Sequence, residues 1–433
     1  MALQPTNKTL IEKLKSISPK GTQKDKGMMK AERELKKKQT SSIKKYRELV
    51  SNGNKNNYWN NLCYEAFSDH KSSERPFKDK CGHLFSKISD VSINIVDGVM
   101  EPLKTSPPPN ICISNINQLK EGVFLNYLNK TESSHDAFIN LNNGMCKNGS
   151  VFSVEKSEIP QIIHINHIIK KPGIQQARQV FNIEPNAQVT FIETFQGKTE
   201  RFENTISQWV IKENACVDKY SFGSRAGSHK KSQSVFTEFI EQHSNSACDF
   251  YSFFYSKGSL GFGGNVRNNI KLELSGKNIL SNLWSVSLLN NAAGVDNNIY
   301  LKHLMPHCSS SQVFKGLFDG ESKGKFDSCV YVAPNAQKSD TVQKNNNILI
   351  DDGSIINSNP QLEIFADDVK CAHGSTIGQI DNKAMFYMKS RGISESVAKK
   401  LLLSAFVGEV VEAIKNDQIK KIITKEIDAQ FKT

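Results

Sequence analysis

Short runs of β-branched and aromatic residues recur between about residues 160 and 380, separated by Gly, Asn, Ser and Asp. Three of these runs each follow a small residue placed after a polar turn: 188–192 after Ala187, 216–220 after Ala215 and 249–254 after Ala247. Recurrence at about 20–30 residues, without helical patterns in between, predicts a stacked β-solenoid whose coils bury their apolar faces against one another. An antiparallel sandwich also contains many short strands, but it usually relies on two-residue Asn-Gly or Asp-Gly hairpins, and the Asp352-Gly353 pair of this chain lies between two runs of unlike pattern.

The period of the apolar residues becomes helical after Gly392. Ser394 is a suitable N-cap, and the apolar residues that follow share one broad face: Val397, Leu401, Leu402, Ala405, Phe406, Val410, Val411 and Ile414. A second helix is predicted over roughly residues 417–431. A stripe this wide packs either on the body of the protein or on a partner, and the pattern leaves both open.

These patterns divide the chain into four parts. Residues 1–80 form a basic segment, helical to about residue 50 and rich in Asn, Lys and Ser after it. Residues 81–160 are a mixed α/β lead-in, and an alternating run at 91–96 begins its β character. Residues 161–382 form the β core, and residues 383–433 form a C-terminal helical segment.

The formal charge of +12 on 433 residues comes mainly from the first 50, which hold 14 Lys and Arg against 5 Asp and Glu. One hypothesis is a nucleic-acid-binding tail. We favour a solvated helix face, because no aromatic residues interleave with these lysines to stack on bases. No apolar run is long enough for a membrane span or a signal peptide. We therefore expect a cytoplasmic protein without a membrane partner, and an organelle is also compatible with this sequence.

The cysteines are scattered. Nine are present and none forms a CxxC pair, which is untypical of zinc ribbons and disulfide frameworks. Cys216 and Cys248 come at the starts of strands and suggest interior packing. His303, His307 and Cys308 resemble a metal cluster, but we favour a structural role for them.

Cys371 and His373 form the most suggestive pair. They are two residues apart, so on a strand both side chains emerge on one face. Thiolate and imidazole are suitable ligands for iron. Two donors do not complete a cluster site, and a buried thiol beside a hydrogen-bonded histidine is the alternative reading. Glu363 is a candidate supporting group, although a solvated glutamate is the simpler interpretation.

The segment 360–378, which contains Cys371-Ala372-His373-Gly374, closely resembles the signature of the SufD family. The resemblance continues through 384–393 into Ala405-Phe406 and Glu409-Val410, and upstream it includes Phe314-Lys315-Gly316 and 345–350. It is good from about 300 to 415, fair from 90 to 300 and poor before that. In the N-terminal region only Lys55 and Trp59 echo the family pattern. The resemblance implies a right-handed parallel β-helix core flanked by helical segments.

The resemblance also implies a function. SufD-like proteins pair with SufB and dock the SufC ATPase through their C-terminal helices, for which the candidates in this chain are Arg391, Gly392, Leu401, Leu402, Ala405, Phe406 and Glu409. Such a chain is not an enzyme and holds no permanent cofactor. It shares a transient iron–sulfur cluster with SufB, through His373 and Cys371, and the complex passes the cluster to recipient apo-proteins.

Other interpretations remain open. A SufB-like paralogue would carry a Gln-Cys-Asp-Ser pattern where this chain has Gln343-Lys344-Asn345-Asn346-Asn347. A solenoid enzyme acting on polysaccharide would need paired carboxylates on one exposed face. A β-solenoid with an unassigned binding role is a further alternative.

Overall fold

The computed structural model describes residues 30–52, 82–103, 106–116, 127–131, 136–146, 149–171, 173–197, 201–223, 232–256 and 264–431. Most of the predicted connection 51–80 therefore lies outside the described residues. Strands dominate the fold and form two sheets, of ten and nine strands. We call the ten-stranded sheet A and the nine-stranded sheet B.

Both sheets draw their strands from β-rich segments along most of the chain. Sheet A contains β1 (Val91–Val96), β2 (Val99–Met100), β5 (Gln161–Ile169), β7 (Gln188–Gly197), β9 (Cys216–Gly223), β11 (Ala247–Tyr255), β13 (Leu280–Leu289), β15 (Ser309–Phe318), β17 (Asp340–Leu349) and β19 (Lys370–Gly378). Sheet B contains β3 (Ile111–Asn115), β4 (Ser150–Val154), β6 (Gly173–Ile183), β8 (Arg201–Ile211), β10 (Gln233–Gln242), β12 (Asn265–Leu274), β14 (Gly294–His303), β16 (Lys323–Val332) and β18 (Ile355–Ile364).

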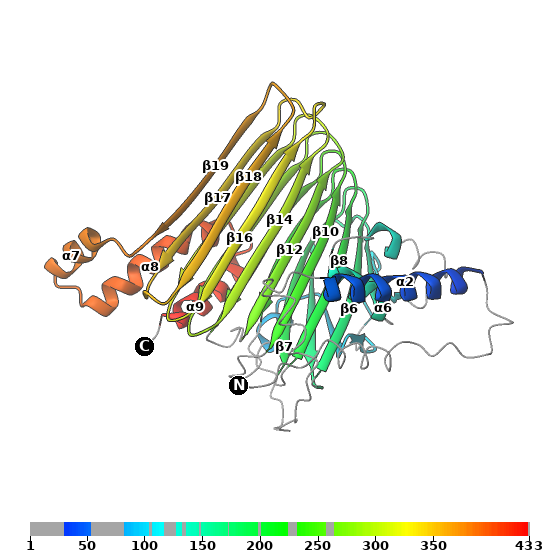
Figure 1. The fold of residues 1–433 in the computed structure, drawn as a ribbon, viewed down its shortest axis with the longest axis horizontal. Coiled ribbons are helices and arrows are strands. Elements are labelled where there is room, and N and C mark those ends of the chain that lie inside the picture. Colours follow the sequence, from blue (N-terminus) through cyan, green and yellow to red (C-terminus); the bar gives the residue numbers. More distant parts are fainter. Residues whose placement is uncertain are drawn as a thin grey trace.

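The two sheets are the two walls of a parallel β-solenoid. From β5 onward the chain alternates between the sheets, and each strand pairs in parallel with the strand two places later, as β15 does with β17. Each coil thus places one strand in each wall (Figure 1). The predicted mainly β solenoid with helical segments at both ends is confirmed. Residues 81–160 also contribute, because β1 pairs in parallel with β5 and β4 with β6.

The turns that lead from sheet B to sheet A explain the repeat in the sequence. The six turns from β6–β7 through β16–β17 each have a residue with φ near +60°, which favours asparagine: Asn186, Asn214, Asn245, Asn278, and then His307 and Lys338. Their amides stack, and Asn278 Nδ2 donates to Asn245 Oδ1 at 3.0 Å. The next residue is buried and mostly small, as at Ala187 and Ala215. The pairing of Ala247 with Cys216 makes Ser246, not Ala247, the counterpart of Ala215.

The core of the solenoid lies between the two sheets. Its aromatic residues stack along the axis: the ring centroids of Phe181 and Trp209 are 3.7 Å apart, and Phe191 meets both rings edge-on. Aliphatic residues continue the same cluster toward the last coils, through Leu272, Leu301 and Val330. Burial of this surface is the main term that holds the coils together.

Helices cover the outer faces. The C-terminal helices are α7 (Asn382–Ser390), α8 (Glu395–Glu412) and α9 (Asp417–Gln430), and the others are α2 (Lys30–Asn52), α4 (Gly82–Ser86) and α6 (Ala137–Met145). Leu403, Val407 and Val410 of α8 are buried against the aromatic outer face of sheet A, where Tyr251 donates a hydrogen bond to the Ala413 carbonyl at 2.8 Å. The predicted stripe is therefore divided: its residues from Val410 onward are buried on the body, whereas Val397, Leu401 and Ala405 are exposed. Helices α2 and α6 lie near the first coils (Figure 1).

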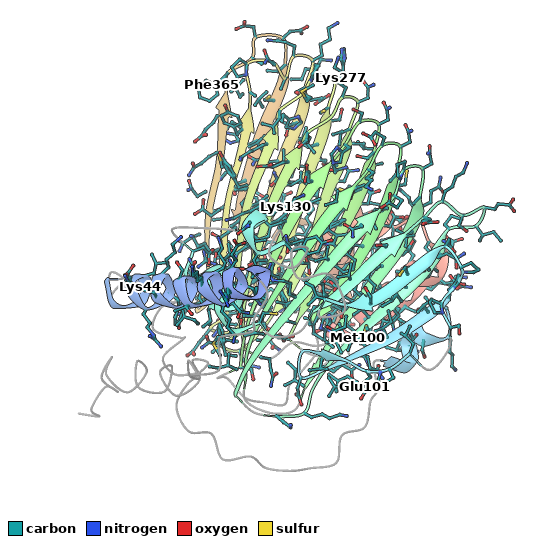
Figure 2. The ribbon with its side chains drawn as sticks, turned by 90° about the vertical axis from the view of Figure 1, so that its right-hand side faces the viewer. Lys44, Met100, Glu101, Lys130, Lys277 and Phe365 are labelled. Carbon is teal, nitrogen blue, oxygen red and sulfur yellow. The ribbon has the colours of Figure 1, made fainter. Side chains whose placement is uncertain are left out.

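The two ends of the solenoid differ. At the first coils, antiparallel strands finish both sheets: β2 pairs with β1, and β3 pairs with β4. At the other end β19 is the outermost strand of sheet A and β18 that of sheet B, and α7 projects away from them (Figure 1). Figure 2 shows the turns at Lys277 and Phe365 at one end of the strands.

Candidate functional site

Cys371 and His373 lie on β19 and face the inside of the solenoid. In the parallel register Cys371 follows the buried Thr341, and His373 follows the buried Gln343. Cys371 packs against the edge of the interior cluster, together with Leu362 and Val369. Two residues further along the same face, Ser375 Oγ donates to Ser358 Oγ of β18 at 2.7 Å. The predicted common face of the pair is therefore the inner face of the last coil.

Both side chains remain accessible although they face inward. No other coil of the described residues covers them, so Cys371 is half-buried and every other residue of β19 is exposed. A Cβ added to Gly374 or Gly378 would meet no atom within 4 Å. Among the residues that the structure describes, His373 makes no hydrogen bond or ion pair. Burial and the nearby Asp340 carboxylate raise the pKa of the Cys371 thiol, so the free thiol is protonated until a cation replaces the proton.

The donor set is incomplete among the residues that the structure describes. In the described part of the structure no group of three or more His, Cys, Asp or Glu side chains is arranged to hold a metal ion. Glu363 does not complete the set, because it is exposed on the outer face of β18, beside Cys329. Cys371 and His373 can supply one sulfur and one nitrogen ligand. The remaining ligands for a metal ion or cluster must come from outside the described residues.

The last coil also presents unpaired backbone groups. Strand β19 pairs only with β17, and β18 pairs only with β16, among the strands that the structure describes, so the outer N–H and C=O groups of both strands face solvent. Such an edge is a template for the strands of another chain. Ile355 and Ile377 on these strands are 51% and 50% exposed. An incoming coil would cover the edge, these apolar groups, and the Cys371 and His373 side chains together.

The predicted docking residues fall into two sets. Leu401 and Ala405 are exposed on α8, and Arg391 and Gly392 are exposed at the end of α7. They adjoin Phe386 and Tyr387, which are 74% and 59% exposed. Leu402 and Phe406 are half-buried. Glu409 is engaged within the chain: it pairs with Lys315 at 2.8 Å and Lys344 at 3.2 Å.

The other predicted residues have structural positions. Cys248 is interior, and burial raises the pKa of its thiol to about 12, whereas Cys216 is exposed because it lies one register position away. His303 is buried, donates to or accepts from Ser310 Oγ at 2.9 Å, and has a pKa lowered to about 4 by burial. His307 occupies a left-handed turn and Cys308 is buried, so these three form no cluster.

A buried charged group inside the first coils was not predicted. Lys219 Nζ pairs with Glu193 Oε2 at 2.7 Å and with Glu238, and Trp209 Nε1 donates to Glu238 Oε2 at 2.6 Å. Burial disfavours ionisation of Glu193, but Lys219 and His167 outweigh it and lower the pKa of this carboxyl to about 2. The only signal in the sequence is a charged residue at an inward position of an alternating strand.

Comparison with known families agrees with this architecture. Residues 166–406 match the family described as "SUF system FeS cluster assembly, SufBD core domain". The chain belongs to the SufBD family. The match spans the solenoid from β5 through the last coil and includes most of α8. Cys371, His373 and the exposed apolar residues Phe386, Tyr387, Val397 and Leu401 therefore lie within the family domain, whereas Glu409 lies just beyond it.

Individual SufBD relatives are similar over parts of their length. The chain is 33% identical to the iron–sulfur cluster assembly protein SufD of Escherichia coli over 162 residues, which are 37% of this chain and 38% of that protein. It is 28% identical to a SufBD family protein of Synechocystis over 67% of this chain and 65% of the relative. A chloroplastic protein of Arabidopsis thaliana is 28% identical over 58% of this chain and 52% of its own length. The matches thus span between 38% and 65% of these relatives.

Membership places the chain in iron–sulfur cluster assembly. No helix of the described residues is long and apolar enough to cross a membrane.

Proposed function

We propose that the chain is the SufD-type, non-catalytic subunit of a complex with SufB and the SufC ATPase, on which an iron–sulfur cluster is assembled. The observation that carries the proposal is the open last coil. This coil combines an unpaired strand edge, exposed apolar groups and two inward-facing ligand residues that need further donors. A SufB chain stacked on β18 and β19 would supply both the missing strands and the missing ligands. Bacterial and chloroplastic relatives fit either a cytoplasmic or an organellar setting.

The cluster is cargo in this account, and no cofactor is resident. Cys371 loses its proton when iron binds, and His373 contributes a neutral ring nitrogen. Sharing the ligands between two chains leaves the cluster weakly enclosed, which suits its transfer to an apo-protein. A SufB-like assignment is less well supported, because the stretch from Gln343 to Asn347 contains no thiol.

SufC is proposed to dock on the projecting helices. The exposed patch there consists of Phe386, Tyr387, Val397 and Leu401, and it lies on the part of α7 and α8 that does not touch the solenoid. Deleting the whole helical segment is a poor test, since Leu403 and Val407 cover the aromatic face of sheet A. A single exposed position such as Leu401 tests docking without removing core.

The test is co-expression of the tagged chain with SufB and SufC, followed by purification and cluster reconstitution. We expect both partners to co-purify with the chain. Leu401→Glu should release SufC and leave SufB bound. His373→Ala should leave the complex assembled and lower its cluster content, because a ligand is lost while an exposed side chain contributes little to folding.

The matched control is His243→Ala, which removes a partly exposed histidine from a coil far from β19. Its complex should load clusters as the unmodified complex does. A chain that purifies alone would refute the proposed complex. Normal cluster loading of the His373→Ala complex would refute the role of that residue.

A further inference from the structure

Beneath His373, a line of polar side chains runs into the interior of the solenoid. Gln343 Nε2 donates to Ser328 Oγ at 2.8 Å, and Ser328 Oγ donates to Gln312 Oε1 at 2.7 Å. All three side chains are fully buried. They come from three strands, β17, β16 and β15, so the line crosses from one sheet to the other and back.

The direction of these hydrogen bonds leaves one atom at each end without a partner. At the inner end it is the donor Gln312 Nε2, and at the outer end it is the acceptor Gln343 Oε1. A buried amide oxygen without a hydrogen bond is costly. Gln343 lies on β17, the strand that pairs with β19. The unpartnered acceptor is thus at the end of the line that is nearer to the last coil.

The neighbour of Gln343 in that direction is His373. The two residues are directly paired in the parallel ladder of β17 and β19, so their Cα atoms are roughly 4.8 Å apart, and both side chains project inward. On the facing strand, β18 places Pro360 and Leu362 near the ring, and neither side chain has a donor. On the inner side of Gln343, the directly paired Gln312 carries the unpartnered donor Nε2. On the open side, the ring N–H of His373 is the donor within reach of Gln343 Oε1.

We propose that Gln343 is the positioning residue of the site: its Oε1 accepts a hydrogen bond from one ring nitrogen of His373. This bond fixes the tautomer and orientation of the ring and directs the other nitrogen to the open end of the solenoid. A ligand histidine commonly donates its second ring N–H in this way. The inference rests on the proposed role of His373 in cluster binding. The hydrogen bond itself, which neither side chain makes in the described structure, needs neither a cluster nor a partner chain to form.

The first experiment is NMR of the full chain labelled with ¹⁵N-histidine, with the His373→Ala spectrum used to assign the His373 ring. In the unmodified chain we expect a single neutral tautomer and a ring N–H protected from exchange. In Gln343→Leu the two tautomers should interconvert and the protection should be lost. Gln343→Glu keeps an acceptor and should retain a single tautomer, which a purely structural role of Gln343 does not require.

The matched control is Gln361→Leu, which makes the same change at an exposed position on the outer face of β18 and should leave the ring signal unaltered. An averaged tautomer in the unmodified chain would overturn the proposal even if Gln343→Leu fails to fold.

A second readout separates this inference from the proposed function. In the complex with SufB and SufC, Gln343→Leu should reduce cluster loading roughly tenfold, within the range of such supporting residues. Loss of the single tautomer with full loading would keep the hydrogen bond and reject the role of His373 in cluster binding. An unchanged tautomer in Gln343→Leu would reject the positioning role alone.

Discussion

At the scale of single residues, Arg178 illustrates how the N-terminal helical part is fixed to the solenoid. Its guanidinium is fully buried on the outer face of β6 and donates to Thr131 Oγ1 at 3.1 Å and Gln208 Oε1 at 2.9 Å. It also donates to Asn142 and Asn143 of α6. Burial lowers its pKa to about 10, so the group stays charged at neutral pH. These contacts tie α6 to sheet B.

Replacement of this arginine by an apolar residue should be severely destabilising. Arg178→Met leaves several buried amide and hydroxyl oxygens without donors, and we expect the free energy of unfolding to fall by about 3 kcal/mol. Urea denaturation followed by the fluorescence of the tryptophans, including the buried Trp209, measures the change. Arg391→Met, at an exposed position, should shift the midpoint very little. Equal midpoints for the two variants would contradict the structural role assigned to Arg178.

The sequence predicts residue positions better than residue surroundings. The spacing of Cys371 and His373 is sufficient to place both on one face of a strand. It does not reveal that this face is the inner one. Polar ligand residues suggest an exposed outer face, and in this fold an inward face is exposed at the last coil. The sequence pattern makes Cys216 and Cys248 equivalent, but a shift of one register position places them on opposite faces.

At the scale of elements, helix α8 serves two surfaces. Its inner side packs on sheet A, and Glu409 anchors it there through Lys315, whose side chain is only 10% exposed and also lies over the ring of Phe406. Its other side carries the exposed Val397 and Leu401. The apolar pattern predicted the helix and the width of its stripe. It did not separate the two surfaces, since both are apolar.

The Glu409 anchor should depend on pH. The hydrogen bond from Lys315 and the charges of Lys315 and Lys344 lower the pKa of Glu409. The anchor therefore stabilises the fold above the usual glutamate pKa of about 4.3 and loses this effect as pH falls through the lower value in the folded protein. We expect Glu409→Gln to reduce the melting temperature at pH 7 and to have almost no effect near the acid limit.

The control for this prediction is Glu395→Gln on the same helix. Glu395 pairs with Lys389 of α7 at 2.7 Å and is solvent-exposed, so its loss should hardly change the melting temperature. A deficit of Glu409→Gln that stays constant from pH 7 to acid would contradict the ionic anchor.

At the scale of the whole molecule, the solenoid is asymmetric. Antiparallel strands finish the first coils, whereas the last coil ends in a parallel edge with no strand beyond it among the described residues. The sequence predicted the solenoid from its repeat and the helices that follow it. It did not predict which end is covered, because a terminal coil has the same alternation as an internal one.

The central claim is that this open coil is where the chain meets SufB. The most direct test places a photo-crosslinking amino acid at Ile377 on β19, and at the exposed Leu280 of β13 as the matched position, in the co-expressed complex. The account predicts a crosslink to SufB from residue 377 and none from residue 280. An assembled complex in which residue 377 forms no crosslink to SufB would contradict it.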